Sequence, residues 1–101
     1  MSPITNEHLP ERLLNEIRAL AERHGIGRLV LFGSRARGDH RKTSDIDLAA
    51  RGGDTRAFSV DLEEETGTLL RFDCVDLDAP IRPELRAAIE EEGRLVYENA
   101  G

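Results

Sequence analysis

The sequence contains one cysteine, no tryptophan, few other aromatic residues and no long apolar run. Cys74 has no partner for an internal disulfide or a cysteine-based metal cluster, and its apolar flanks predict a buried thiol in a strand. Aromatic residues make up 4% of the chain, so stacking on nucleic-acid bases is not expected. The apolar runs are far shorter than a membrane span and the N-terminus does not resemble a signal peptide. We therefore expect a cytoplasmic protein without membrane contact.

The chain is acidic overall but basic in one stretch. Its formal net charge is -6, which argues against direct nucleic-acid binding, because that function neutralises many phosphates. Positions 28 to 42 nevertheless carry five basic residues against one aspartate. A basic turn in an acidic protein suits a small polyanion held together with metal ions. The plainer alternative is a solvated basic loop.

The size and apolar spacing of the chain predict its fold class. At 101 residues we expect a single domain covering 1–101. Helices and strands alternate, which indicates an α/β (α+β) fold with a small mixed β-sheet and helices packed against it. The predicted elements are a helix over 9–24, a strand over 28–32, a helical turn from Ser34, a strand over 45–50, a helix from 54 or 55 to about 66, a strand over 71–77, a helix over 84–92 and a short strand over 94–97.

Each predicted helix carries its apolar residues on one face. Pro10 and Gly25 mark the ends of the first helix, and we interpret His24 as a residue of its last turn rather than a metal ligand. Asp54 or Thr55 could cap the second helix. The expected inner faces are Leu13, Leu14, Ile17, Leu20 and Ala21 in the first helix, Phe58, Leu62 and Leu69 in the second, and Leu85, Ala88 and Ile89 in the third.

Two aspartates alternate along the predicted strand over 45–50. Asp45 and Asp47 are two residues apart, so their carboxylates leave the same face of the strand. Like charges this close are costly unless cations neutralise them, and oxygen ligands without His or Cys favour Mg²⁺, with Mn²⁺ as its substitute. Asp73 or Asp76, on opposite faces of the strand over 71–77, could add a third carboxylate. Three such aspartates suit a two-metal phosphoryl-transfer site.

Gly33-Ser34 supplies the complementary part of this site. A glycine at a strand end lets a phosphate approach the backbone, and the Ser34 hydroxyl and free amides can hold its oxygens. Four basic residues follow where triphosphate charge would need compensation: Arg35, Arg37, Arg41 and Lys42. A Gly-Ser turn alone is usually only a turn, and an Asp-x-Asp pair is often a surface strand. Their combination at this spacing indicates a nucleotide and metal site.

The stretch GSRARGDHRKTSDIDL resembles the signature of the minimal nucleotidyltransferases of the polymerase-β-like superfamily. The matching residues are Gly33, Ser34, Asp45 and Asp47, and FDCVDLD resembles the family's third-carboxylate strand, which assigns that role to Asp73. The likeness covers most of the chain. It implies catalytic and metal-binding roles for Asp45, Asp47 and Asp73, and a nucleotide-binding set of Gly33, Ser34, Arg35, Arg37 and Ser44.

The resemblance also implies an activity and a partner. A nucleoside triphosphate, ATP in the first instance, would bind with Mg²⁺, and a nucleoside monophosphate would pass to an acceptor hydroxyl. Asp45 and Asp47 would bridge two ions, and Asp73 would hold the catalytic ion and could accept the hydroxyl proton. Short proteins of this family are commonly antitoxins paired with a helical HEPN-type ribonuclease toxin. The modification would then be AMP transfer to a toxin tyrosine, with the toxin supplying the acceptor.

Two other functions are compatible with the same residues. The chain could neutralise a partner by contact alone, with a vestigial or nucleotide-sensing site. It could also act on a small molecule such as an aminoglycoside, as a homodimer that builds a cleft from two chains. Three carboxylates that face one pocket favour the enzyme, because neutralisation by contact does not require them.

Overall fold

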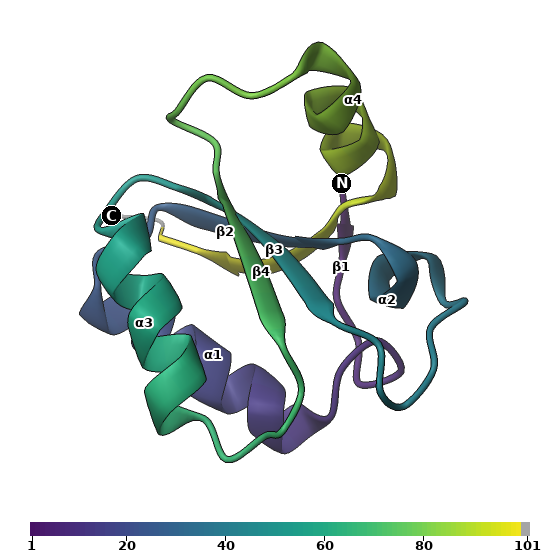
Figure 1. Cartoon of the computed structure of the whole chain (residues 1–101), viewed down its shortest axis with the longest axis vertical. Helices are drawn as coiled ribbons and strands as arrows, with labels where there is room; N and C mark the ends of the chain where they lie inside the picture. The colour runs from purple at the N-terminus through teal and green to yellow at the C-terminus, as the bar shows by residue number, and fades with distance from the viewer. Residues whose placement is uncertain (100–101) are drawn as a thin grey trace.

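The computed structural model describes residues 1–99, which form a five-stranded mixed sheet with helices packed on both faces (Figure 1). No helix among these residues is long and apolar enough to span a membrane. The elements are β1 (Ser2–Pro3), α1 (Glu11–Arg23), β2 (Arg28–Phe32), α2 (Ser34–Arg37), β3 (Ile46–Arg51), α3 (Thr55–Glu65), β4 (Phe72–Asp76), α4 (Pro83–Glu92) and β5 (Arg94–Glu98).

The strands lie in the order β1-β5-β2-β3-β4. The central strand β2 is antiparallel to both β3 and β5, whereas β4 runs parallel to β3 and β1 runs parallel to β5. Residues Leu29 to Phe32 are buried at consecutive positions, because β2 is covered on both faces. The mixed sheet with packed helices confirms the fold class expected from the sequence.

The two faces of the sheet carry separate cores. On one face of the sheet lie α1 and α3 (Figure 1). The core on this face includes Leu29, Leu31 and Leu48 of the strands and Phe58 of α3. On the other, α4 covers a smaller cluster of Val30, Phe32, Ala49, Val75 and Ile89. Alternation along β2 and β3 divides the side chains between these faces. The five residues expected on the inner face of α1 are all buried.

Two features differ from the sequence expectations. Leu69, expected on the inner face of the second helix, is fully exposed. The helix ends before it, because Thr66 adopts extended backbone angles (φ -80°, ψ 144°) and its hydroxyl donates to the Leu62 carbonyl at 2.6 Å. Leu69 therefore lies in the connection to β4. The two-residue strand β1 was not expected, since Ser2–Pro3 has no alternating pattern and pairs only with the distant β5.

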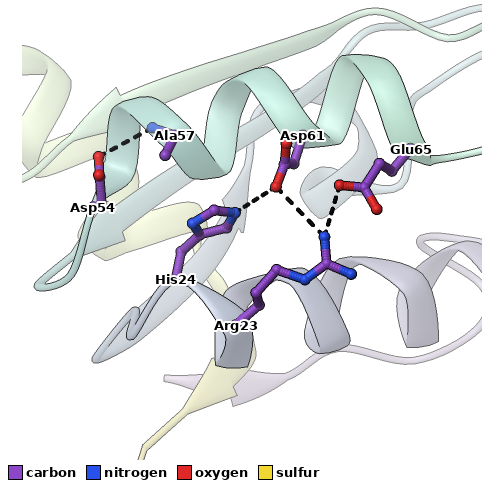
Figure 2. Close-up of polar contacts among 6 residues, drawn as sticks. All are labelled: Arg23, His24, Asp54, Ala57, Asp61 and Glu65. Atoms are coloured by element: carbon purple, nitrogen blue, oxygen red, sulfur yellow. Dashed lines mark hydrogen bonds and ion pairs between the residues drawn. The ribbon is translucent and has the colours of Figure 1, made fainter.

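A polar network joins the C-terminal end of α1 to α3 (Figure 2). His24 Nε2 lies 2.6 Å from Asp61 Oδ2, and Arg23 Nη1 lies 2.6 Å from Glu65 Oε2 and 3.5 Å from Asp61 Oδ2. Asp54 caps α3, because its carboxylate accepts the Ala57 N–H at 3.1 Å. The hydrogen bond from His24, with smaller contributions from His24 and Arg23 charge, lowers the pKa of Asp61.

The lowered pKa of Asp61 makes this contact sensitive to acid. Its stabilising contribution is complete above the pKa of an unfolded aspartate, about 3.9, and disappears as pH falls through the lower folded pKa. Asp61→Asn should therefore reduce the free energy of unfolding at neutral pH, and its difference from the parent protein should shrink below about pH 4. Urea unfolding at a series of pH values measures this difference.

Glu64→Gln is the matched control, since it removes the same charge from an exposed position of α3 with no ion pair among the described residues. A deficit of Asp61→Asn that stays constant down to pH 2, or one that Glu64→Gln reproduces, would contradict the assignment.

Candidate active site

The site begins where β2 ends at Gly33. Phe32 pairs with Asp47 across the antiparallel β2–β3 ladder, so the next residue, Gly33, lies beside the Asp47 carboxylate. Gly33 has φ 78° and ψ -158°, a conformation that is essentially restricted to glycine. A Cβ added at Gly33 would overlap Asp47 Oδ2. A glycine is thus required here by both the backbone angles and the close approach of the carboxylate.

Two carboxylates lie opposite each other on β3 and β4. Asp47 and Asp73 are direct partners in the parallel ladder, so their side chains leave the same face of the sheet. Alternation along the chain directs Asp45, two residues before Asp47, to this face as well. It is the face that carries Ala49 and Val75 farther along the same strands, beneath α4. The three aspartates expected at the site are therefore brought to one end of two neighbouring strands.

The electrostatics of Asp47 reflect this crowding. Burial raises the pKa of Asp47, and the charges of Asp73 and Asp45 raise it further, while Arg37 opposes them. Among residues 1–99, no three His, Cys, Asp or Glu side chains are already gathered as a complete set of metal ligands. The donor set nevertheless fits a hard cation, because repulsion among neighbouring carboxylates is relieved by a bound Mg²⁺ or Mn²⁺.

Asp76, the alternative third carboxylate, lies elsewhere. It pairs with Ala50 at the far end of the β3–β4 ladder and alternates to the face opposite Asp73. Its carboxylate accepts the N–H of Asp78 at 2.9 Å in the following turn.

Cys74, which lies between Asp73 and Asp76 in β4, is a free and half-buried thiol. Burial, with the charges of Asp73 and Asp76, raises the pKa of Cys74 to about 12, so the thiolate is disfavoured.

Arg35 braces the loop that connects α2 to β3. Its side chain is buried, with 4% of the residue exposed, and burial lowers its pKa. Its Nε donates to the carbonyl of Ser44 at 3.1 Å, and its Nη2 donates to that of Lys42 at 3.1 Å and that of Arg41 at 3.5 Å. Arg35 was expected to bind nucleotide; its described contacts hold the loop that leads into Asp45.

Arg37 has a different setting, in the last turn of α2. Its guanidinium is nearly half exposed and pairs with Asp39 at 3.2 Å and with Glu92 of α4 at 3.1 Å. The Arg37 charge also acts to lower the pKa of Asp47, against the larger effects that raise it. Glu92 was not expected near the site. It is 55 positions from Arg37 in a helix with several similar glutamates, so no local pattern distinguishes it.

The two serines expected to bind nucleotide lie at the start of α2 and at the end of the loop that connects α2 to β3. Ser34 is the first residue of α2 and is half-buried, and its carbonyl accepts the N–H groups of Gly38 and Asp39. Ser44 directly precedes Asp45, and its hydroxyl accepts the Arg41 N–H at 2.8 Å. Gly33 thus borders the Asp47 carboxylate at the end of β2, Ser34 follows it at the start of α2, and Ser44 closes the turn on the β3 side.

Solved structures share this fold. A structure assigned as a minimal nucleotidyltransferase is 31% identical, with a TM-score of 0.65, and the match covers 92% of this chain and 97% of that one. A toxin-antitoxin crystal structure with AMP-PNP is 24% identical, with a TM-score of 0.68 and coverage of 86% and 74%. A protein from Shewanella oneidensis is 15% identical, with a TM-score of 0.64 and coverage of 88% and 72%. At these lower identities the likeness shows the fold alone.

The family comparison covers most of the sequence. No curated protein matches the chain. Residues 15–100 match the family described as Polymerase beta, Nucleotidyltransferase, and this range includes Gly33 and all three aspartates of the site. Since the match extends over far more than half of the chain, the protein belongs to the polymerase-β nucleotidyltransferase family.

Proposed function

We propose that the protein is a Mg²⁺-dependent nucleotidyltransferase that transfers AMP from ATP to a hydroxyl group of a partner protein, acting in the cytoplasm as the antitoxin of a HEPN-type toxin. The observation that carries this proposal is the juxtaposition of Asp47 and Asp73 on adjacent strands, with Asp45 on the same face and Gly33 directly beside Asp47. Membership of the nucleotidyltransferase family supports the reaction class.

The chain's own residues suggest how the reactants are held. Asp45, Asp47 and Asp73 would hold Mg²⁺, which when bound neutralises triphosphate charge and polarises the reacting phosphate. The Ser34 hydroxyl and the first N–H groups of α2 would donate hydrogen bonds to phosphate oxygens. Arg37, partly exposed and already acting electrostatically on Asp47, would balance the remaining negative charge. Arg35 would contribute by holding the loop, and Ser44 by closing it.

The transfer is a substitution at the α-phosphorus of ATP. The acceptor oxygen forms a bond to this phosphorus, the bond from phosphorus to the bridging oxygen breaks, and pyrophosphate leaves. The hydroxyl proton passes to Asp73, the carboxylate on the edge strand β4. Asp73 is exposed, which suits a group that must meet an acceptor arriving from solvent.

The nature of the partner is supported by the solved relatives. One similar structure is a toxin-antitoxin complex with AMP-PNP, an ATP analogue, and another is a toxin-antitoxin complex named MntA-HpeT. These names support ATP as the nucleotide and a toxin as the partner. The family resemblance adds the HEPN type and a tyrosine as the acceptor. The contact-only antitoxin is the alternative that the following experiment separates.

Asp45→Asn combined with Asp47→Asn should abolish AMP transfer, because two of the three carboxylates that would hold Mg²⁺ are lost. The purified full chain, Mg²⁺ and ATP labelled at the α-phosphate are incubated with an extract of the source cells, and labelled protein is measured after electrophoresis. Asp76→Asn is the matched control, because it removes a carboxylate from the same strand pair on the other face. Labelling that survives the double change would contradict the proposal. A double variant that still protects cells from the toxin would favour neutralisation by contact.

Gly33→Ala should lower the transfer rate by about 100-fold, because the new methyl group displaces the Asp47 carboxylate. Gly38→Ala is the matched control: Gly38 also has a positive φ, 85°, but a Cβ there meets nothing within 4 Å. It should cost about 1 to 2 kcal/mol of backbone strain and leave the rate nearly unchanged. Rates and free energies of unfolding are measured for both variants. Equal loss of activity in the two would show that Gly33 serves backbone conformation alone.

A further inference from the structure

The strand that carries Asp73 is an edge of the sheet. β4 is last in the strand order and pairs with β3 on one side only (Figure 1, where β4 is the green strand between α3 and α4). An unpaired edge presents a row of backbone N–H and C=O groups that can template another strand. At the opposite edge, β1 is a strand of two residues. The longer open edge is therefore the one that borders the proposed catalytic carboxylates.

The hydrogen bonds at the ends of the ladder show which groups point outward. The Ile46 N–H donates to the Arg71 carbonyl, and the Leu77 N–H donates to the Ala50 carbonyl, both at 2.8 Å. In a parallel ladder the bonded positions alternate, so the odd-numbered residues of β4 bond to β3. The N–H and C=O groups of Phe72 and Cys74 thus face away from the sheet and have no hydrogen-bond partner among residues 1–99.

The side chains along this edge indicate the chemistry of an occupant. Leu69, fully exposed, stands just before the strand. Asp73 and Asp76 are both exposed on β4 and Asp78 is exposed in the following turn, against Arg71 as the one basic residue of 71–78. The edge is therefore acidic with an apolar residue at its N-terminal end. A basic segment complements this charge, whereas a second copy of the chain would bring two acidic edges together.

An added strand would deliver a side chain to the reacting carboxylate. Neighbouring strands lie about 4.8 Å apart, and cross-strand partners have Cβ atoms about 4.5 to 5.5 Å apart on the same face. A residue opposite Asp73 would therefore project from the face that carries Asp47 and Asp73. A hydroxyl at that position could give its proton to Asp73. The main-chain bonds would supply affinity, and the register would select one hydroxyl.

We propose that the free edge of β4 docks the acceptor by strand addition: an extended, basic segment of the partner protein pairs with Phe72 and Cys74, places its hydroxyl residue opposite Asp73, and sets an apolar side chain against Leu69. This inference rests on the proposed function for the identity of the occupant. The pairing itself requires no nucleotide, so it can be tested apart from transfer.

Hydrogen exchange of the isotopically labelled full chain, without ATP, tests the pairing. The probe is a ten-residue peptide of alternating lysine and threonine with one central tyrosine and a leucine four residues from it on either side. At millimolar peptide, the Phe72 and Cys74 amides should exchange about tenfold more slowly, because they gain partners. The Asp73 and Val75 amides should change little, since they already bond to β3. Unchanged exchange of Phe72 and Cys74 would overturn the proposal.

Backbone methylation of the peptide gives the sharper control. Two versions carry N-methyl groups at alternate residues, one set on each edge of the extended peptide. The version whose methyl groups face β4 should no longer slow the exchange of the Phe72 and Cys74 amides. The version whose methyl groups face away from β4 should still slow it. Equal behaviour of the two versions would show that the peptide binds by its side chains rather than as a strand, which would overturn the proposal.

Protein variants test the side-chain contributions. Leu69→Ala should weaken binding several-fold, whereas Val60→Ala, at a partly exposed position of α3, should not. A peptide with glutamate in place of lysine should give no protection. An equal loss of binding in Leu69→Ala and Val60→Ala, or equal binding of the lysine peptide and the glutamate peptide, would contradict the assigned occupant. Pairing without AMP labelling of any protein would refute the proposed reaction but not the docking edge. AMP labelling without pairing would refute the docking edge but not the proposed reaction.

Discussion

The carboxylates of Asp47 and Asp73 are held side by side on adjacent strands, and the rest of the site follows from this unfavourable pairing of like charges. Burial and two neighbouring charges raise the pKa of Asp47 together. The sheet can impose this arrangement because apolar side chains pack the strands on both faces, with Leu48 and Ala49 fully buried directly after Asp47. A rigid, well-packed base thus maintains a concentration of negative charge that free side chains would avoid.

Basic residues around this acidic centre divide into two kinds. Arg35 is buried and satisfies three loop carbonyls, so its charge contributes mainly to the shape of the loop that leads into Asp45. Arg37 stays near the surface, shared between Asp39 and Glu92, and acts on Asp47 through space. The composition of the basic turn does not distinguish these roles. Burial does, because a guanidinium enclosed by carbonyls cannot also turn toward solvent.

The sequence was most informative where the signal is local. The helical spacing of α1, the buried run of β2 and the turn at Gly33-Ser34 all appear at their expected places, because each depends on periodicity or backbone conformation within a few residues. Alternation along β4 places Asp73 and Asp76 on opposite faces of the sheet, but it does not show which of them joins Asp45 and Asp47 as the third carboxylate. That choice depends on the register against β3, a pairing between residues 26 positions apart. The Arg37–Glu92 ion pair also depends on how distant segments meet. Leu69 is exposed for a local reason, because α3 ends at Glu65 and the apolar spacing alone does not mark that end.

The position of Asp73 on a strand with a single neighbour links ligand binding to local unfolding. Opening an edge strand breaks one ladder, whereas opening an inner strand breaks two, so β4 belongs to the part of the sheet that frays most readily. Each opening separates Asp73 from Asp47 and leaves the other strands in place. A ligand that joins these two carboxylates binds only the closed state, and by mass action it suppresses the fraying of β4. The affinity of the site therefore includes the free energy needed to keep this strand closed.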